Sequence, residues 1–432
     1  MTPVYAGILG FVALVVLMLI RMPVGFVMAL VGFAGFGLLV SWPASLNLLI
    51  RDLFSTFNSY NLTVIPLFVL MGQIAHYSGI SGRLFRSANK FLGHLPGGLA
   101  IATIGACAGF SAICGSTSAT AATMASVALP EMKKYQYDPA MATGVVAVGG
   151  SLGILIPPST IFIIYGIMTE QSVGKLFMAG ILPGILLTLL FIASIVLWTK
   201  IQPDVCGRAP KATWSERFSS LTGVIETFIL FAVVMGGLFI GFFTPTESAA
   251  IGALGTIVIA FVGGHLTWSH VRNAFQETTR ISCMIMVIVA GATVFGHFLA
   301  VTTIPSQIGG WAAALPLPPA AVIGVIIMVY LFLGCLMDSL AMIMLTIPLF
   351  FPVVVTLGYD PIWFGVIIVL VAEMGVVTPP IGINVYVVAG VARDVPLQTI
   401  FKGASRLLLA LLVAAVLLVI FPKIALYLPR LM

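Results

Sequence analysis

Apolar segments long enough to cross a membrane follow one another along almost the whole chain, with only short polar loops between them. A helix needs about 20 consecutive apolar residues to cross the hydrocarbon core of a bilayer. The segments that meet this length are residues 4–20, 23–41, 61–79, 140–168, 176–199, 222–242, 247–264, 281–300, 362–390 and 405–428. The pattern therefore predicts an all-α integral membrane protein with about ten transmembrane helices.

Two further apolar stretches, residues 96–135 and 318–358, are too long for one crossing, and each has a polar centre that favours a helix break. The centre is Gly115–Ser118 in the first stretch and Met337–Ser339 in the second. We interpret each stretch as a re-entrant hairpin of two helices whose tip reaches membrane depth. Two ordinary short spans are the alternative, because they would also return the chain to the side from which it started.

The spans at 140–168 and 362–390 each contain a sequence that cannot continue a regular α-helix. The first reads GGSLGILIPPS and ends at Ser159, and the second reads TPPIGIN and begins at Thr378. Proline lacks an N–H donor and pushes the residue before it out of the α region. Irregular backbone inside a bilayer must be buried in protein or hold an ion or substrate, so we predict two functional broken helices.

Three segments of mixed polarity lie outside these spans, namely residues 44–58, 80–95 and 265–280. Each is short enough to be an amphipathic helix at the membrane surface or a simple loop, and the sequence leaves both possibilities open.

One ungapped offset of 379 − 157 = 222 residues aligns the two halves of the chain. It places Pro157 on Pro379 and Gly153 on Gly375, and it also aligns two copies of the tripeptide Tyr-Asp-Pro. Matches that fall on turn-forming residues rather than on Leu and Val indicate an internal repeat. Each repeat has an odd number of crossings, five, so the two repeats should have inverted topology. They are predicted to cover residues 1–218 and 219–432.

Composition and charge fix the class of protein and its predicted orientation. Of the residues, 60% are hydrophobic and only 7% are charged, against about a quarter charged in soluble domains. The net charge of +6 comes from basic residues in short loops, so it is a topology signal rather than a nucleic-acid footprint. The basic loops share one side, the cytoplasm, if both termini are periplasmic. No Lys or Arg occurs between residues 281 and 392, so the first hairpin should enter from the cytoplasm and the second from the periplasm.

Each repeat offers one hairpin tip and one helix break that could form an ion site together. Half-helices that meet at mid-membrane present unpaired C-terminal carbonyls to cations. All-oxygen ligation suits a hard cation such as Na⁺ rather than a transition metal. The first predicted Na⁺ site comprises Cys114, Ser116, Gly153, Ile156 and Pro158, and the second comprises Gly334, Gly375, Thr378 and Ile381. Helix packing through small residues is the alternative role for any single serine.

Polar residues around the same tips and breaks are candidates for a substrate region. Asp338 and Glu373 are acids at predicted membrane depth, where a charge is costly, which makes them functional candidates; a hydrogen-bonded structural acid is the alternative. The candidate set is Thr117, Ser118, Ser159, Asp338, Ser339, Glu373 and Asn384. No nucleotide-binding motif and no nucleophile–base arrangement is evident in the sequence, so neither ATP use nor enzymatic activity is predicted.

Five sequence motifs together resemble one protein family: GSTSATAA, GGSLGILIPPS, TPTESAAIGA, GCLMDSLAMIMLTIPLFFPV and TPPIGINVYVVAG. The combination is similar to the large membrane subunit of the tripartite ATP-independent periplasmic (TRAP) transporters, and the resemblance covers nearly the whole chain. It implies an inverted-repeat, elevator-type secondary transporter of the bacterial inner membrane. Such a protein takes up organic acid anions, for example C4-dicarboxylates or sialic acid, with Na⁺ as coupling ion and no other cofactor.

The resemblance also implies two protein partners, a small four-helix membrane subunit and a periplasmic substrate-binding protein. Because the chain begins directly at the large-subunit repeat, we expect the small subunit to be a separate polypeptide. The family can carry Ser where this chain has Cys114, a difference that matters only if the ligand there is a hydroxyl rather than a backbone carbonyl. A stand-alone Na⁺/dicarboxylate symporter with similar hairpins is the alternative function. A structural scaffold or an intramembrane enzyme is a more distant alternative, against which the paired ion sites argue.

Overall fold

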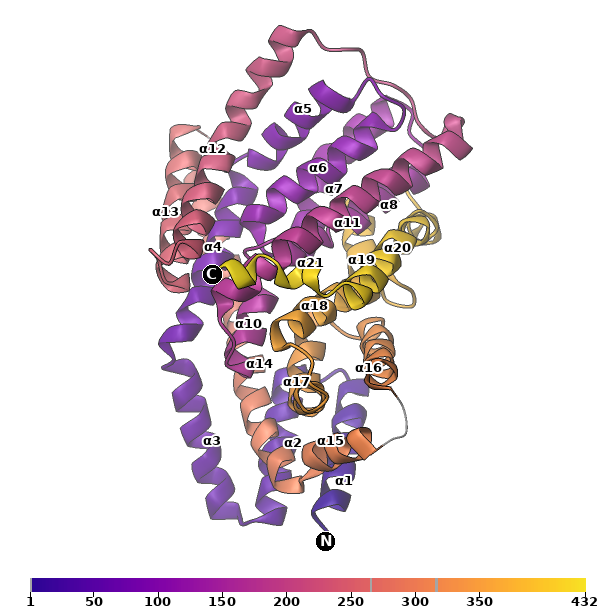
Figure 1. Cartoon of the computed structure of the whole chain (residues 1–432). Helices are drawn as coiled ribbons and strands as arrows, with labels where there is room; N and C mark the ends of the chain where they lie inside the picture. The colour runs from indigo at the N-terminus through magenta and orange to yellow at the C-terminus, as the bar shows by residue number, and fades with distance from the viewer. Residues whose placement is uncertain (1, 265, 315–317) are drawn as a thin grey trace.

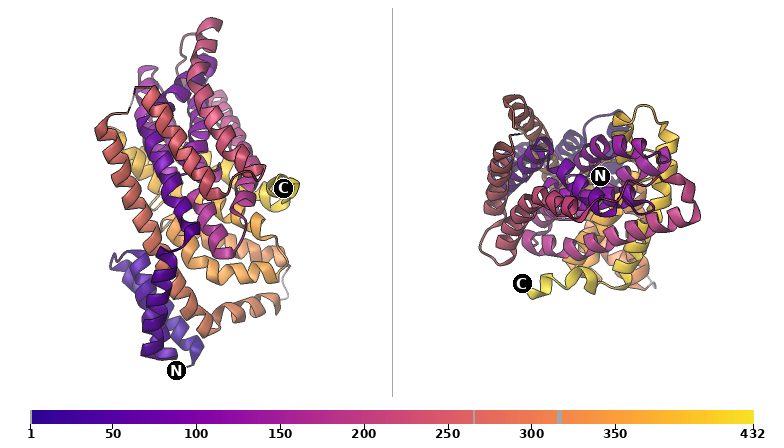
Figure 2. Two further views of the ribbon diagram at one scale, coloured as in Figure 1. Left: turned by 90° about the vertical axis from the view of Figure 1, so that its left-hand side faces the viewer. Right: turned by 90° about the horizontal axis from the view of Figure 1, so that it is seen from above.

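The computed structural model describes residues 2–264, 266–314 and 318–432, and all the regular structure in these residues is helical (Figure 1). The helices form one elongated molecule, with the N-terminus at one end and the C-terminus near the middle (Figures 1 and 2). The predicted all-α architecture is therefore confirmed.

The helices of the first half are α1 (Pro3–Leu19), α2 (Val24–Leu39), α3 (Trp42–Phe57), η1 (Tyr60–Thr63), α4 (Val64–Tyr77), α5 (Ile80–Leu92), α6 (Gly98–Cys114), α7 (Thr117–Lys134), α8 (Pro139–Gly149), α9 (Leu152–Leu155), α10 (Thr160–Thr169), α11 (Val173–Ile201) and η2 (Pro203–Val205). Those of the second half are α12 (Trp214–Phe239), α13 (Pro245–Val262), α14 (Trp268–Thr302), α15 (Ile304–Ala314), α16 (Pro319–Gly334), α17 (Ser339–Thr356), α18 (Pro361–Val377), α19 (Ile383–Val391), α20 (Leu397–Ile420), α21 (Lys423–Leu426) and η3 (Pro429–Leu431).

Both predicted hairpins are present as two helices joined by a short turn. In the first, α6 ends at Gly115, whose φ of +63° lies in the left-handed region that glycine adopts without strain. In the second, the carboxylate of Asp338 accepts a hydrogen bond from the backbone N–H of Leu340 at 3.1 Å and caps α17. The helices α7 and α17 begin at Thr117 and Ser339, which are 339 − 117 = 222 residues apart.

Both predicted broken helices are also present. The first runs from α8 to α10 with the single turn α9 between them, and the second runs from α18 to α19. Each begins at the Tyr-Asp-Pro tripeptide, whose Asp caps the helix. Asp138 accepts hydrogen bonds from the N–H groups of Ala140 and Met141, at 2.9 and 3.1 Å. Asp360 accepts the equivalent pair. Proline then occupies the first helical position, where its missing N–H costs nothing.

Several boundaries differ from the prediction. Residues 268–280 are helical and continuous with the span that follows, in α14, because neither Gly nor Pro interrupts the chain there. The segments 44–58 and 80–95 are the helices α3 and α5, and α3 meets the following helix at a bend of 49°. The last span ends at Ile420 rather than 428, just before Pro422.

By length and composition, seven helices in the described residues could cross a membrane, or up to eight if the bent pair of α3 and α4 is one span. Five more apolar helices are shorter, among them α6, α16 and α18 of the hairpins and broken helices. The predicted number of about ten therefore depends on how these shorter helices are counted.

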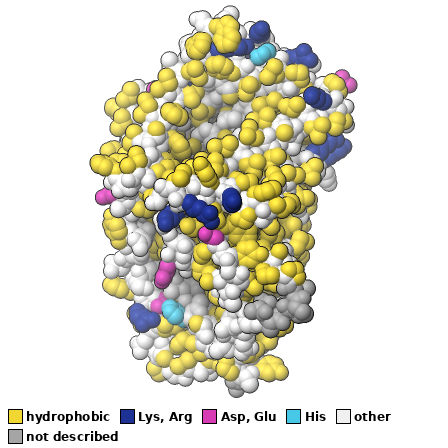
Figure 3. Space-filling view, viewed as in Figure 1, with side chains coloured by type: hydrophobic (Ala, Val, Ile, Leu, Met, Phe, Trp, Pro, Cys, Tyr) yellow, Lys and Arg dark blue, Asp and Glu magenta, His cyan; other side chains and the backbone are white. Residues whose placement is uncertain are grey.

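The broken helices form the core of the molecule. Every residue of α18 from Trp363 to Val377 is buried. The helix α20 packs on α8 so closely that a methyl group at Gly403 would collide with the carbonyl of Ala140, so glycine is required there. On the outside, hydrophobic side chains cover most of the face in Figure 3, and charged side chains gather in a few clusters. An apolar exterior of this kind is what a bilayer solvates.

Candidate ion and substrate site

The first hairpin tip lies directly on the first helix break. A methyl group at Gly153 would lie 2.5 Å from the carbonyl oxygen of Ser116, and one at Gly115 would lie 2.8 Å from that of Pro158. Only glycine lets two backbones approach so closely. The hydroxyl of Thr160 donates a further hydrogen bond to the carbonyl of Gly115 at 3.3 Å. Ser116, Gly153 and Pro158 of the first predicted site are therefore brought together.

The second hairpin tip lies on the second break in the same way. A methyl group at Gly375 would lie 2.4 Å from the carbonyl carbon of Gly334. Three residues further on, the hydroxyl of Thr378 donates its proton to the carbonyl of Met374, which leaves the oxygen lone pairs free for another ligand. Gly334 and Gly375 of the second predicted site are thus in contact. Ile381 has a hydrocarbon side chain, so only its backbone carbonyl could serve as a ligand, and the residue is 39% exposed.

Proline removes one regular helical hydrogen bond at each break. In a regular helix the carbonyl of Gly153 would accept a hydrogen bond from residue 157, but Pro157 has no N–H. Pro379 has the same effect on Gly375, which instead accepts from the N–H of Thr378 at 3.1 Å. In the part of the chain that the structure describes, no hydrogen bond reaches the carbonyls of Cys114, Gly153, Ile156, Pro158, Gly334, Thr378 and Ile381.

The buried members of this set, at Cys114, Gly153, Pro158 and Gly334, fit a small hard cation, because a buried carbonyl that lacks a donor needs another positive partner. The thiol of Cys114 is not required in such a site. It points to the carbonyl of Ser116 at 3.9 Å, while its own carbonyl is free. Ser116 has a second role, because its hydroxyl accepts a hydrogen bond from the N–H of Ala119 at 3.4 Å and caps α7.

A hydrogen-bonded cluster joins the first tip to the second break. The amide nitrogen of Asn384, which is fully buried, donates to the hydroxyl of Thr117 at 2.7 Å and to the carbonyl of Ala147 at 3.1 Å. Gly150 makes room for this cluster, since a methyl group there would lie 3.0 Å from the carbonyl oxygen of Thr117 and 3.1 Å from the amide nitrogen. Two members of the predicted substrate region, 267 residues apart, are therefore in contact.

The two acids of the predicted substrate region have different surroundings. Asp338 caps α17, so one of its carboxyl oxygens has a structural role as a hydrogen-bond acceptor. Glu373 is fully buried, and neither of its carboxyl oxygens makes a hydrogen bond to a described residue. It lies within electrostatic reach of Asp338 and beside Thr117. A buried carboxyl without a hydrogen-bonded partner is costly, which makes Glu373 the stronger functional candidate.

The remaining candidates are serines with local partners or none. The hydroxyl of Ser118 lies 3.4 Å from that of Ser116 at the first tip. Ser159 accepts a hydrogen bond from the N–H of Phe162 at 3.3 Å and caps α10, which is a structural role. Ser339 is buried, and its hydroxyl has no hydrogen-bond partner among the described residues.

Sequence reasoning missed two groups of this region, the hydroxyl of Thr160 and the carbonyl of Ala147. Thr160 directly follows the Pro-Pro-Ser sequence, so its place at the start of a half-helix was a usable signal. The repeat did not single it out, because the 222-residue offset pairs it with Gly382, which has no side chain. The carbonyl of Ala147 has no signal in the sequence at all.

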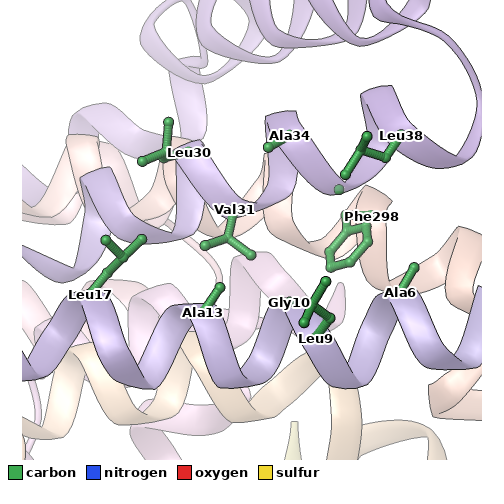
Figure 4. A pocket seen from close by; sticks show the side chains of 11 residues that line it. Ala6, Leu9, Gly10, Ala13, Leu17, Leu30, Val31, Ala34, Leu38 and Phe298 are labelled. Carbon is green, nitrogen blue, oxygen red and sulfur yellow. The ribbon is translucent and has the colours of Figure 1, made fainter.

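A separate cavity of about 230 Å³ lies between α1 and α2 (Figure 4). Its side chains are apolar throughout, including Leu17, Val31 and the ring of Phe298. No group in it could hold an ion or orient an anion, so it is not part of the candidate site.

Comparison with known proteins identifies the family. Residues 11–424 match the family described as "Tripartite ATP-independent periplasmic transporter, DctM component". The chain belongs to this family. It is therefore a large permease of the TRAP transporters and a multi-pass membrane protein.

Curated relatives of this TRAP permease differ in the substrates for which they are named. A C4-dicarboxylate TRAP transporter large permease from Pseudomonas aeruginosa is 36% identical and covers 90% of each chain. A sialic acid large permease from Vibrio cholerae is 32% identical over 95% of each. An ectoine/5-hydroxyectoine large permease from Ruegeria pomeroyi is 30% identical over 97% of each.

Solved structures support the fold. The YdaH transporter of Alcanivorax borkumensis superposes with a TM-score of 0.65, at 17% identity, and the match covers 88% of this chain and 89% of that one. MtrF of Neisseria gonorrhoeae gives a TM-score of 0.54 at 16% identity, over 86% and 83%. At these identities the likeness concerns the fold alone.

Proposed function

We propose that this permease takes up an organic acid anion by Na⁺-coupled secondary transport. The observation that carries the proposal is the contact of each hairpin tip with a helix break, made once by Gly153 and Ser116 and once by Gly375 and Gly334. Each contact gathers backbone carbonyls that lack hydrogen-bond donors among the described residues. Two such clusters give two Na⁺ sites, one for each half of the chain.

The buried polar groups between these sites form the proposed substrate region. Thr117 and Asn384 bind each other and the carbonyl of Ala147, so a carboxylate would reach their hydroxyl and amide donors only by replacing one of these hydrogen bonds. Glu373 is fully buried two residues before Gly375, so a cation bound there would favour the ionised form of its carboxyl group. Bound Na⁺ would in turn lower the cost of bringing the anion to membrane depth, and this mutual dependence is the physical basis of the coupling.

The proposed mechanism is an elevator movement of two inverted repeats, residues 1–218 and 219–432. Its support is the equal spacing of corresponding elements, such as the broken helices that start at Pro139 and Pro361, 222 residues apart. The hairpins and broken helices pack on one another, for example α7 on α8 and α17 on α18, and would move as a unit. Helices such as α2, α4, α13 and α14 also pack among themselves and would form the static scaffold.

The proposed setting is the bacterial inner membrane, with both termini in the periplasm. A small four-helix membrane subunit would hold the scaffold, and a periplasmic binding protein would deliver the substrate. The support is the family's tripartite, periplasmic description, together with relatives named for C4-dicarboxylates and sialic acid.

Uptake into proteoliposomes tests the coupling. The permease is reconstituted with its small subunit, and the loaded binding protein is added outside. An inward Na⁺ gradient should drive accumulation of the anion without ATP. Undiminished uptake with choline in place of Na⁺ would show that Na⁺ is not the coupling ion.

A further inference from the structure

A cavity of about 520 Å³ lies at the far ends of α7, α8 and α19, away from the hairpin tip. Its walls are largely apolar, and the polar groups that line it are Ser126, Lys133, Tyr137, Thr143 and Asp394. Small-molecule sites have this volume and this combination of apolar walls with a few polar groups.

The hydrogen bonds of the lining groups determine which of them can donate to a ligand. The hydroxyl of Tyr137 accepts from the backbone N–H of Leu99 at 3.1 Å, so its own proton is free to be donated. Ser126 and Thr143 donate their protons to backbone carbonyls of their own helices, at 2.7 and 2.6 Å, so Tyr137 and Lys133 are the lining groups that could donate to an anion.

A single ion pair lies at the mouth of the cavity. The ammonium of Lys133 contacts the carboxylate of Asp394 at 2.6 Å and lowers the pKa of Asp394, so the pair is charged at neutral pH. Both side chains are mostly exposed, at 77% and 62%. Exposed pairs contribute only about 0–1 kcal/mol, so a carboxylate from solution can take the place of Asp394 at little cost.

The cavity shares the helices α8 and α19 with the candidate substrate region. On α8, Thr143 lies one turn from Ala147, whose carbonyl binds Asn384. On α19, Val391 lines the cavity seven residues after Asn384, about 10 Å along the helix axis. The cavity and the candidate substrate region are therefore built on the same two helices, about one to two turns apart.

We propose that this cavity is a second, weak binding site for the transported organic anion, in which the ammonium of Lys133 exchanges Asp394 for the carboxylate of the anion. The proposal rests on the proposed function and orientation, which place the cavity on the route to the cytoplasm. Asp394 keeps the site weak, because the anion must compete with a carboxylate that is part of the protein.

The first test measures the charge preference of the cavity and needs no knowledge of the substrate. Ser126→Cys is introduced into the permease with its exposed native cysteines replaced, in complex with the small subunit. Its labelling rates with an anionic and a cationic methanethiosulfonate are compared. Lys133→Gln should lower the anionic-to-cationic ratio at least threefold and Asp394→Asn should raise it by a similar factor. Lys134→Gln, the matched control outside the cavity lining, should leave the ratio unchanged.

The second test uses succinate as the probe. At tens of millimolar it should slow labelling of Ser126→Cys, more strongly with Asp394→Asn and not at all with Lys133→Gln. The proposal would be overturned if Lys133→Gln left the labelling ratio unchanged, or if succinate did not slow labelling in any variant. Failure of the proposed function is read separately, from uptake that does not need Na⁺, because neither labelling test requires transport.

Discussion

The amide nitrogen of Asn384 donates a 2.7 Å hydrogen bond to the hydroxyl of Thr117, and this bond joins the tip of the first hairpin to the break of the second broken helix. The same amide also holds the carbonyl of Ala147, one turn before the first break. Elements from both halves of the chain therefore meet at one fully buried side chain. A ligand bound here would contact the first hairpin and both broken helices at once.

Removing either partner of this bond should destabilise the protein. Asn384→Ala leaves the hydroxyl of Thr117 and a buried carbonyl without their donor, at a cost of about 1–3 kcal/mol. Thr117→Val should cost less, because it removes a single hydroxyl. Directly bonded residues are coupled, so the double variant should lose about 0.5–3 kcal/mol less than the sum of the single losses. Unfolding in mixed detergent micelles measures all three, and additive losses would show that the two residues act independently.

The glycines at the two contacts should tolerate no side chain. Gly153→Ala and Gly375→Ala each place a methyl group about 2.5 Å from the opposing backbone, which must push the tip off the break. We expect uptake to fall at least tenfold in both variants at equal membrane abundance. Gly105→Ala and Gly324→Ala are controls in the two hairpins that these breaks contact, because a methyl group at either would have no neighbour within 4 Å.

In the control variants uptake should stay normal, and stability should rise by up to about 1 kcal/mol, the usual gain for alanine in a helix interior. Equal loss of uptake in the control and contact variants would show that the hairpins need glycine for helix flexibility rather than for close contact.

The fold could be predicted from the sequence because the residues at its helix starts and breaks have strong local conformational preferences. Pro157 and Pro379 mark the two breaks, and Asp138 and Asp360 mark where the broken helices start. Each of these signals acts within a turn of its own position, so no tertiary information was needed to interpret it. The continuity of α14 was not readable, because a mixed-polarity segment such as 268–280 suits a loop and a helix end equally well.

The site was readable only in part, for a related reason. The repeat pointed to both tips and both breaks, but which tip touches which break depends on packing across more than 30 residues of chain. The contact of Thr117 with Asn384 depends on packing across 267 residues. Capping also cannot be told from ligation in a sequence, since Ser116, Ser159 and Asp338 are all residues that favour helix starts.

The two hairpins should enter the membrane from opposite faces. Gln136 follows the first hairpin among basic residues, and Ser306 precedes the second in a stretch without Lys or Arg; both are exposed. Single cysteines at these positions, in a background without native cysteines, are treated on intact cells with an impermeant thiol reagent. Cysteine at 306 should be labelled, and cysteine at 136 only after the membrane is permeabilised. The reverse pattern would contradict the proposed orientation, and labelling of both on intact cells would contradict the inversion.

The hydroxyls and the prolines of the two sites should affect Na⁺ dependence differently. Ser116→Ala and Thr378→Val each remove one of several oxygen ligands, a loss of about 1–2 kcal/mol, or roughly 5- to 30-fold in Na⁺ affinity. Pro157→Ala and Pro379→Ala restore an N–H that can recapture the carbonyls of the break and extend the helix. Uptake in the proline variants should therefore fall severely and should not recover at high Na⁺, whereas the hydroxyl variants should recover.

Ser116 needs a further control, because it also caps α7 and its loss weakens that helix. Ser172 caps α11 through the same kind of hydrogen bond, to the N–H of Lys175 at 3.4 Å, and lies outside both sites. Ser172→Ala should lower stability by about 1 kcal/mol and leave the Na⁺ curve in place. For each variant, uptake is measured against Na⁺ concentration at equal membrane abundance, which shows whether the substituted group contributes to Na⁺ affinity. If Ser116→Ala behaves like Ser172→Ala, and Thr378→Val keeps the wild-type curve, then the two hydroxyls serve packing and capping, and the ions are held by backbone carbonyls alone.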